Sequence, residues 1–164
     1  KTAYEIKECD WSSDVCSSDL VKGGKVYLTA STINQQGTVT ASATSNSSGT
    51  RVEGGMIVAL ANTIKLGSGS KTLATGDNGG GVITLSAAKK VNVKAGAFVD
   101  ASANTSGNGG SINLDAPTVK VHGKLLANGG NQYGNGGSIN IIADRKSTRL
   151  NSSHIPLSRM PSSA

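Results

Sequence analysis

A repeated pattern of two glycines followed by an alternating apolar segment most constrains what this chain can fold into. It occurs as GGKVYLTA from Gly23, GGMIVALA from Gly54, GGVITLSA from Gly80, GGSINLDA from Gly109 and GGSINIIA from Gly136. The second glycines are separated by steps of 31, 26, 29 and 27 residues. Alternation of apolar and polar residues predicts β-strands with one buried face. The regular step indicates a repeat architecture, in which each unit packs against the next.

Between these segments a second pattern recurs, in which a strand is followed by a glycine and then by another short apolar strand. It reads INQQGTVTASA, VNVKAGAFVDASA and VKVHGKLLANGG, and TIKLGSGSKTLATGDNGG is a more polar copy. Each repeat therefore predicts three short strands separated by turns, at which Gly and Asn are expected to supply left-handed backbone conformations. Because strands this short bury little alone, each should pair with its equivalent one turn along. The pattern predicts an all-β parallel β-helix of about four to five coils.

The alternation also predicts which side chains face the interior. Aligning the glycine pairs gives one inward column of branched residues and one of alanines. The first contains Val26, Ile57, Ile83, Ile112 and Ile139, and the second contains Ala30, Ala61, Ala87, Ala116 and Ala143. The neighbours Thr84, Asn113 and Asn140 are expected to face outward, because successive side chains of a strand point to opposite faces. The scarcity of aromatic residues fits a thin aliphatic core.

Three other structures share parts of this pattern. A Gly-, Ser- and Asn-rich tract can be a disordered linker, but here the apolar positions keep their register through five copies. A β-sandwich also contains short strands, although its strands need not repeat in sequence. A calcium-binding β-roll would need an aspartate in each copy, whereas Asp77 alone lies beside a glycine turn.

The two ends of the chain differ from the repeats in composition and are related to each other as DNA. Residues 1–20 and 144–164 contain no glycine, and they hold both cysteines and the single tryptophan. One DNA string that encodes DWSSDVCSSDL has a reverse complement that encodes DRKSTRLNSS, and the outer pieces match in the same way. This string resembles an Illumina-type sequencing adapter. We therefore expect residues 1–20 and 144–164 to be translated adapter and disordered, and residues 21–143 to be a β-helix fragment.

This division removes several candidate sites and places the net charge in the repeats. If these ends are adapter, we expect Cys9 and Cys16 to form neither a disulfide nor a metal site, and His154 to have no catalytic role. The basic run 145–149 is no nucleic-acid tail, so no nucleic-acid partner is expected. Residues 21–143 hold ten Lys and Arg against four Asp and Glu, so they carry the whole net charge of +6. No run in them is long and apolar enough to span a membrane.

The repeats resemble those of a family of bacterial exoproteins. The segments GTVTASA from Gly37 and GNGGSINLDA from Gly107 are similar to the repeat region of filamentous haemagglutinin-type adhesins, and the resemblance covers most of residues 21–143. It implies a right-handed β-helix shaft and a protein that is secreted or held at the cell surface. It also implies export through an outer-membrane transporter of the two-partner pathway and attachment to cells, surfaces or host glycans. Some relatives are stalks of contact-dependent growth-inhibition toxins, which is an alternative function.

The four carboxylates of the repeat region do not recur at one position of the repeat. Glu53 and Asp77 precede glycine turns, Asp100 ends a strand, and Asp115 lies at an outward strand position. Glycoside cleavage usually needs two carboxyl groups about 5–10 Å apart. His122 has no second His or Cys with which to hold a metal. We expect no catalytic, cofactor or metal site; a fragment of a secreted β-helix carbohydrate-active enzyme, a polysaccharide lyase or hydrolase, is the alternative.

The basic residues offer a candidate binding surface. If the segment VNV from Val91 stacks on VKV from Val119, Lys94 lies beside His122 and Asn92 lies beside Lys120. Lys90 and Lys124 would flank them. The predicted stripe therefore contains Lys90, Lys94, Lys120 and Lys124. It could bind sulfated glycans or acidic lipids; alternatively, the lysines discourage sideways aggregation of strands.

The adapter interpretation makes a prediction about genomic DNA. We expect that the native locus, read in one continuous long clone, encodes the repeats without DWSSDVCSSDL before them or RKSTRLNSSH after them. Long-read sequencing of the source DNA checks this. A continuous genomic read that contains either string beside the repeats would contradict the interpretation.

Overall fold

The computed structural model describes residues 15–16, 24–44 and 52–143, and within them it contains β-strands and no helix. The strands are β1 (Val15–Cys16), β2 (Lys25–Gln35), β3 (Thr38–Thr40), β4 (Met56–Leu66), β5 (Lys71–Leu73), β6 (Val82–Val93), β7 (Phe98–Asp100), β8 (Ser111–Ala116), β9 (Thr118–Val121), β10 (Lys124–Leu126) and β11 (Ser138–Ala143). They form two sheets, with strand orders β1-β2-β4-β6-β8-β11 and β10-β7-β5-β3. Strand β9 joins the first sheet by pairing with β6.

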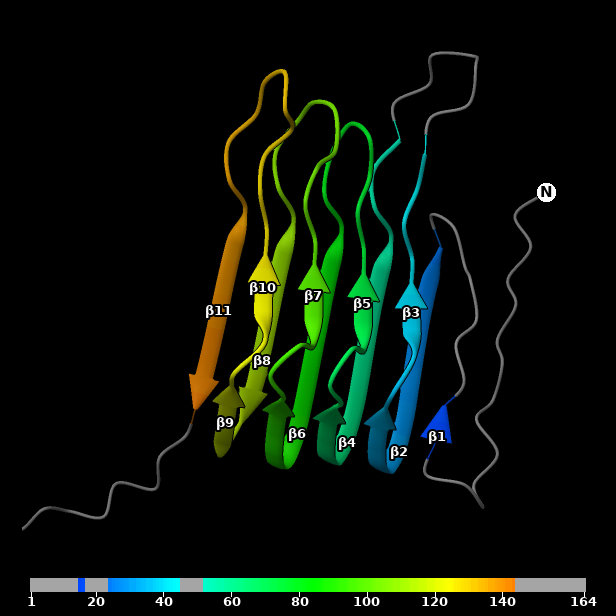
Figure 1. The fold of residues 1–164 in the computed structure, drawn as a ribbon, viewed down its shortest axis with the longest axis vertical. Coiled ribbons are helices and arrows are strands. Elements are labelled where there is room, and N and C mark those ends of the chain that lie inside the picture. The colour runs from blue at the N-terminus through cyan, green and yellow to red at the C-terminus, as the bar shows by residue number, and fades with distance from the viewer. Residues whose placement is uncertain (1–14, 17–23, 45–51, 144–164) are drawn as a thin grey trace, which may run out of the picture.

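Each strand pairs in parallel with the strand that occupies the same place one turn along the chain (Figure 1). The second sheet has four strands, which correspond to four stacked turns. The chain is therefore a β-solenoid, and the predicted parallel β-helix is confirmed. Because neighbouring strands lie about 4.8 Å apart, four turns extend roughly 20 Å along the axis.

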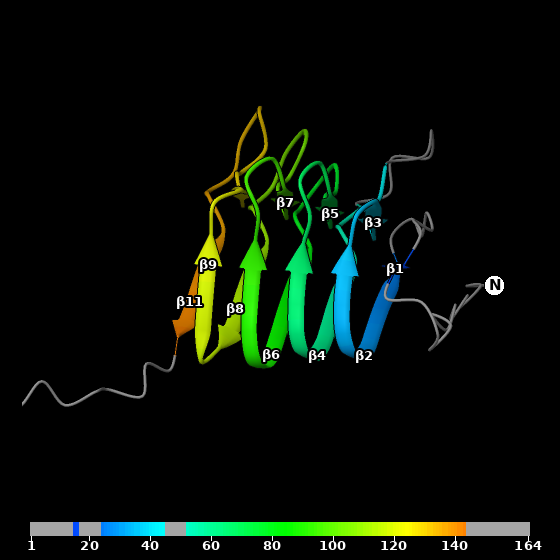
Figure 2. The ribbon, with the colours of Figure 1, turned by 60° about the horizontal axis from the view of Figure 1, so that its bottom comes forward.

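Each coil has three strand positions, which we call the first, second and third limbs. In one coil these positions are the separate strands β8, β9 and β10. In the preceding coils, the first and second limbs form one long strand, β2, β4 or β6, that bends around a corner (Figure 2). The third limb consists of β3, β5, β7 and β10. The three predicted strands per repeat are therefore present, although two of them are usually continuous.

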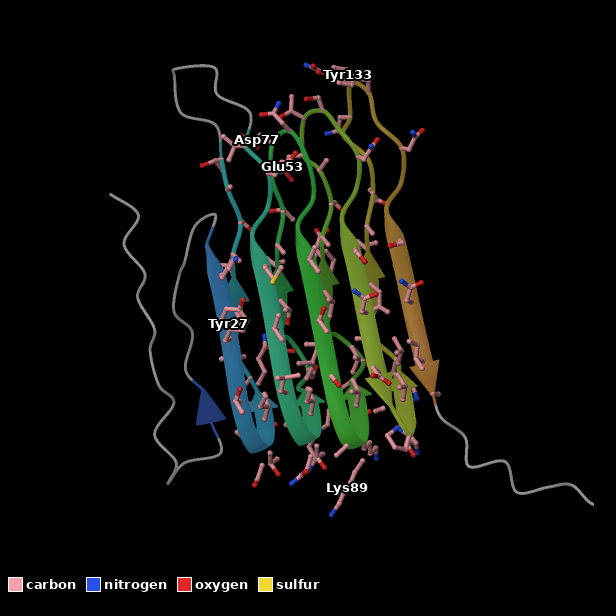
Figure 3. All side chains as sticks on the ribbon, turned by 180° about the vertical axis from the view of Figure 1, so that it is seen from behind. Tyr27, Glu53, Asp77, Lys89 and Tyr133 are labelled. Carbon is pink, nitrogen blue, oxygen red and sulfur yellow. The ribbon has the colours of Figure 1, made fainter. Side chains whose placement is uncertain are left out.

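At the corner between the first and second limbs, β6 contains one residue more than β4. Ala61 pairs with Ala87 and Thr63 pairs with Lys90, so the register shifts between these two pairs. Lys89 lies at this corner and projects outward from the side of the solenoid (Figure 3). Pairing resumes beyond this irregularity, so the residues on both sides of the corner still stack on their equivalents.

The core follows the predicted column of branched residues, whereas of the predicted alanines only Ala87 and Ala116 are buried. Val26, Ile57, Ile83, Ile112 and Ile139 are paired one above another through the first limb. The three central members are at most 1% exposed, whereas Ile139 in β11 is 42% exposed. Asn113 and Asn140 face outward, as predicted, and the Asn140 amide donates a hydrogen bond to Asn113 Oδ1 (3.0 Å). No aromatic residue is buried in the described part of the chain, and Tyr27 is exposed on the first limb (Figure 3).

One coil carries a polar pair inside this aliphatic core. Gln35 is 2% exposed and occupies the column that Leu66 and Val93 fill in the next coils. Its amide nitrogen donates to the carbonyls of Gly37 (3.1 Å) and Lys71 (2.8 Å). Its Oε1 accepts a hydrogen bond from the hydroxyl of Thr72 (3.1 Å). The pair is therefore satisfied internally, as a buried amide must be to avoid a large desolvation cost.

The second glycine of each pair lies against that of the preceding coil. A Cβ atom on Gly55, Gly81 or Gly110 would overlap the carbonyl oxygen of the glycine one turn before it. The N–H of Gly110 also donates to the Ala101 carbonyl (2.7 Å), which closes the base of the intervening loop. Equivalent bonds are made by the second glycine of the other described pairs. Glycine is needed at these places because two backbones come closer than a side chain allows.

The expectation that Gly and Asn supply left-handed turn positions is confirmed for some glycines and is wrong for Asn. Among the described residues, positive φ angles occur at Gly69, Gly96, Gly107 and Gly134, and at no Asn or other residue. The paired glycines are not among them. The predicted reason therefore holds at those four glycines, whereas at the pairs glycine is required by close backbone packing.

The two ends of the chain are described only in part. Val15 and Cys16 form the two-residue strand β1, which pairs with Asn34 and Gln35 at the edge of β2. The other residues of segment 1–20 lie outside the described residues, as do all of 144–164 and therefore His154. The interpretation of these ends as adapter remains a prediction.

The assignment of strand faces predicts the effect of two adjacent substitutions. Ile112→Asp would bury a carboxylate among aliphatic side chains and should lower the free energy of unfolding by several kcal/mol. Asn113→Asp should change it little, because residue 113 faces outward and keeps its bond from Asn140. Denaturant unfolding of the two full-length variants tests this. Comparable losses would contradict the register, and a larger loss for Asn113→Asp would mean that the faces are reversed.

The glycine packing predicts a second contrast. Gly110→Ala places a methyl group on the Gly81 carbonyl and should cost about 1–3 kcal/mol of unfolding free energy. Gly136→Ala should be nearly neutral, because the nearest atom to its Cβ is the Ala127 carbonyl oxygen at 3.8 Å and its φ is not positive. Urea unfolding of both variants measures the difference. Equal midpoints for the two variants would refute a steric requirement at residue 110.

Candidate anion-binding groove

The outward side of the second limb carries most of the predicted basic stripe. Val91 pairs with Val119 and Val93 with Val121, as the sequence predicted, and both β6 valines are buried. The alternate residues therefore face outward. Asn92 is in register with Lys120, which is the juxtaposition expected from the sequence.

These outward side chains line a shallow, open groove of about 600 Å³. Its walls come from two neighbouring coils and from the turn that precedes β5. The lining residues are Ser68, Lys90, Asn92, Lys94, Ala95, Lys120 and His122. The predicted neighbours Lys94 and His122 thus lie on one surface, and the backbone supports this, because the His122 N–H donates to the Val93 carbonyl (2.8 Å).

The structure places Lys124 elsewhere. Lys124 begins β10 and pairs with Phe98 of β7, which in turn pairs with Lys71 of β5. These residues belong to the second sheet, beyond the turn at Gly123, and Lys124 does not line the groove. The prediction that Lys124 flanks the stripe is therefore wrong, because the chain turns a corner between His122 and Lys124.

Sequence reasoning missed Lys65. This residue does not line the groove itself, but it is exposed on β4 beside it and pairs directly with Asn92, one turn before Lys120. The signal was present in the alternation of Ile64, Lys65 and Leu66, because the two apolar residues are buried and the lysine between them is not. The pairing of Lys65 with Asn92 does not follow from the spacing of the repeats, because β6 has one extra residue at the corner and the alignment of the two coils shifts there.

Carboxylates are absent from the outward second-limb positions described by the structure. These positions are Thr32, Asn34, Gln36, Thr63, Lys65, Lys90, Asn92, Lys94, Thr118, Lys120 and His122. Asp115 lies on the first limb and is exposed, as predicted. Glu53 and Asp77 lie in the loops on the opposite side of the solenoid from Lys89 (Figure 3). The second limb therefore presents positive charge that no acidic residue on its own outward side neutralises.

Two of the acidic residues make structural hydrogen bonds. Asp100 Oδ1 accepts a bond from the Ser102 N–H (2.9 Å), which shapes the start of a loop. Asp77 Oδ1 accepts one from the Asn104 amide of the next coil (3.2 Å). Within the described ranges, no three His, Cys, Asp or Glu side chains come together as a metal site would require. Asp77 therefore joins two coils, and Asp100 shapes a loop.

No known protein family, curated protein or solved structure matches this chain. In the part of the chain that the structure describes, no helix is long and apolar enough to cross a membrane. The case for a function therefore comes from the solenoid and its surface chemistry.

Proposed function

We propose that residues 21–143 are a shaft segment of a large secreted bacterial adhesin of the filamentous haemagglutinin type, which attaches cells to other cells or to surfaces. The main support is the stacked register. Equivalent side chains pair through successive first-limb strands without a break in direction. A fold built this way lengthens by adding coils and needs no catalytic centre to serve its purpose.

The side chains on the outside of the solenoid also support a structural role. Ser138 Oγ donates to Ser111 Oγ (3.1 Å), and the Asn140 amide donates to Asn113. In the loops, Asn108 Oδ1 accepts a bond from the Asn135 N–H (2.9 Å). These bonds run from coil to coil along the axis. Hydrogen bonds between side chains of neighbouring coils stabilise the stacking of an elongated solenoid.

The same fold is compatible with a β-helix carbohydrate-active enzyme, a polysaccharide lyase or hydrolase. The groove favours a polysaccharide ligand in either case, because it is open to solvent and most of its lining side chains are polar. The adhesin is preferred because the described carboxylates are spread over different limbs and loops. A polysaccharide that is bound and cleaved by the purified chain would favour the enzyme.

The proposed function predicts the behaviour of the source organism. We expect the protein at the cell surface or in the medium, and we expect deletion of its gene to reduce attachment to surfaces and cells. Deletion of an adjacent outer-membrane transporter gene should remove the protein from the surface and reduce attachment equally. Immunoblotting of surface fractions and a static attachment assay measure both effects. Unchanged attachment in both deletion strains, with growth unaffected, would reject the proposal.

A further inference from the structure

Asn92 lies at the centre of four lysines on the second limb. Lys90 precedes it by two residues on β6, and Lys94 follows it by two, directly after β6 ends at Val93. All three side chains line the groove and therefore share the outward face. Lys65 on β4 and Lys120 on β9 pair with Asn92 from the two neighbouring coils. One neutral amide is therefore surrounded by four ammonium-bearing side chains.

Strand geometry fixes the spacing of this lysine ring. Paired residues on neighbouring strands lie about 4.8 Å apart, and alternate residues of one strand lie about 6.6 Å apart. The four lysine Cα atoms are therefore all within about 7 Å of Asn92 Cα, and Lys65 and Lys120 are about 10 Å apart along the axis. Long, flexible lysine side chains can converge on an acidic group from these positions.

The charges within the ring are separated by neutral residues. Lys90 has Thr63 and Thr118 as its strand partners, and Asn92 lies between Lys65 and Lys120. No two of the four lysines are directly opposite each other, which avoids the destabilising contact of like charges in a cross-strand pair. Four positive charges are thus close together, but no two lysines face each other directly across paired strands. An anion that enters the ring gains from all four charges at once.

The side chains that line the groove indicate which kind of anionic ligand fits it. Its lining has no Phe, Tyr or Trp side chain, whereas single-stranded nucleic acids are usually held by stacking on such rings. It also has no large apolar side chain to insert into a lipid layer, as membrane-surface elements do. The Asn92 amide, the Ser68 hydroxyl and the His122 imidazole instead offer hydrogen-bonding partners for sugar hydroxyls.

We propose that the lysine ring of Lys65, Lys90, Lys94 and Lys120 around Asn92 binds a linear acidic polysaccharide that lies along the solenoid axis. Its carboxylate or sulfate groups contact the lysines of three successive coils, and its hydroxyls contact Asn92 and the groove walls. The biological meaning rests on the proposed attachment function. Binding itself is a property of the purified chain, so the two proposals fail separately.

The test is binding of the full chain to fluorescently labelled polysaccharides, measured by anisotropy at low and moderate salt. Polygalacturonate carries carboxylates, dextran sulfate carries sulfates, and dextran is the neutral control. We expect binding to at least one acidic polymer, weakened by salt, and none to dextran. Binding to one acidic polymer identifies the acidic group. Equal binding to dextran, or no binding to either acidic polymer, would overturn the proposal.

Substitutions distinguish binding at the lysine ring from binding that depends only on the net positive charge of the chain. Lys65→Gln should weaken binding about two- to fivefold, as expected for one exposed ion pair, while Lys124→Gln should leave it unchanged. Asn92→Asp puts a carboxylate inside the ring and should weaken binding more than any single lysine change. Asn113→Asp alters the net charge by the same amount on the first limb and should have no effect. Circular dichroism confirms that each variant is folded.

The matched variants also define failure. If Lys124→Gln weakens binding as much as Lys65→Gln, or if Asn113→Asp weakens it as much as Asn92→Asp, net charge is responsible and the ring is not a site. If the ring variants lose binding but attachment of the source organism is unaffected by gene deletion, the polysaccharide site stands and the adhesin function fails.

Discussion

Stacking of each residue on its equivalent in the next coil is the constraint on which the structure depends. It places two backbones in contact at the glycine pairs that the structure describes, where a Cβ on Gly81 or Gly110 would overlap the carbonyl oxygen of the coil before. It also brings aliphatic residues of several repeats into one buried column. Because the pairing is parallel and nearly in register, a residue's environment depends on its place in the repeat more than on its immediate sequence neighbours.

The fold was readable from the sequence where glycine pairs anchor the register. The Ile57, Ile83 and Ile112 column and the outward position of Asn113 both follow from those anchors and from alternation. The role of the glycines themselves was not readable in the same way. A sequence shows that glycine recurs, but close approach and positive φ both select glycine, and only the backbone geometry separates them.

The candidate site was predicted in part, for a related reason. Lys90, Lys94 and Lys120 were placed correctly because β6 and β9 keep a simple register through the second limb. Lys124 was misplaced because a short turn carries it onto another sheet. Lys65 was missed because the extra residue at the corner of β6 changes the count between coils. Errors of this kind arise at corners, where the chain changes direction and neither alternation nor a glycine pair fixes the alignment.

The buried Gln35–Thr72 pair disfavours stacking of the coils in the wrong order. Coils with similar aliphatic columns could in principle stack in the wrong order, since Ile packs on Val nearly as well as on Ile. Gln35 bonds to Thr72 of the next coil, whereas the coil after that presents Val99 at the equivalent place. A chain that skipped a coil would leave the Gln35 amide oxygen facing a valine in a dry interior. The polar pair therefore favours one order of coils, because only the correct neighbouring coil satisfies the Gln35 side chain.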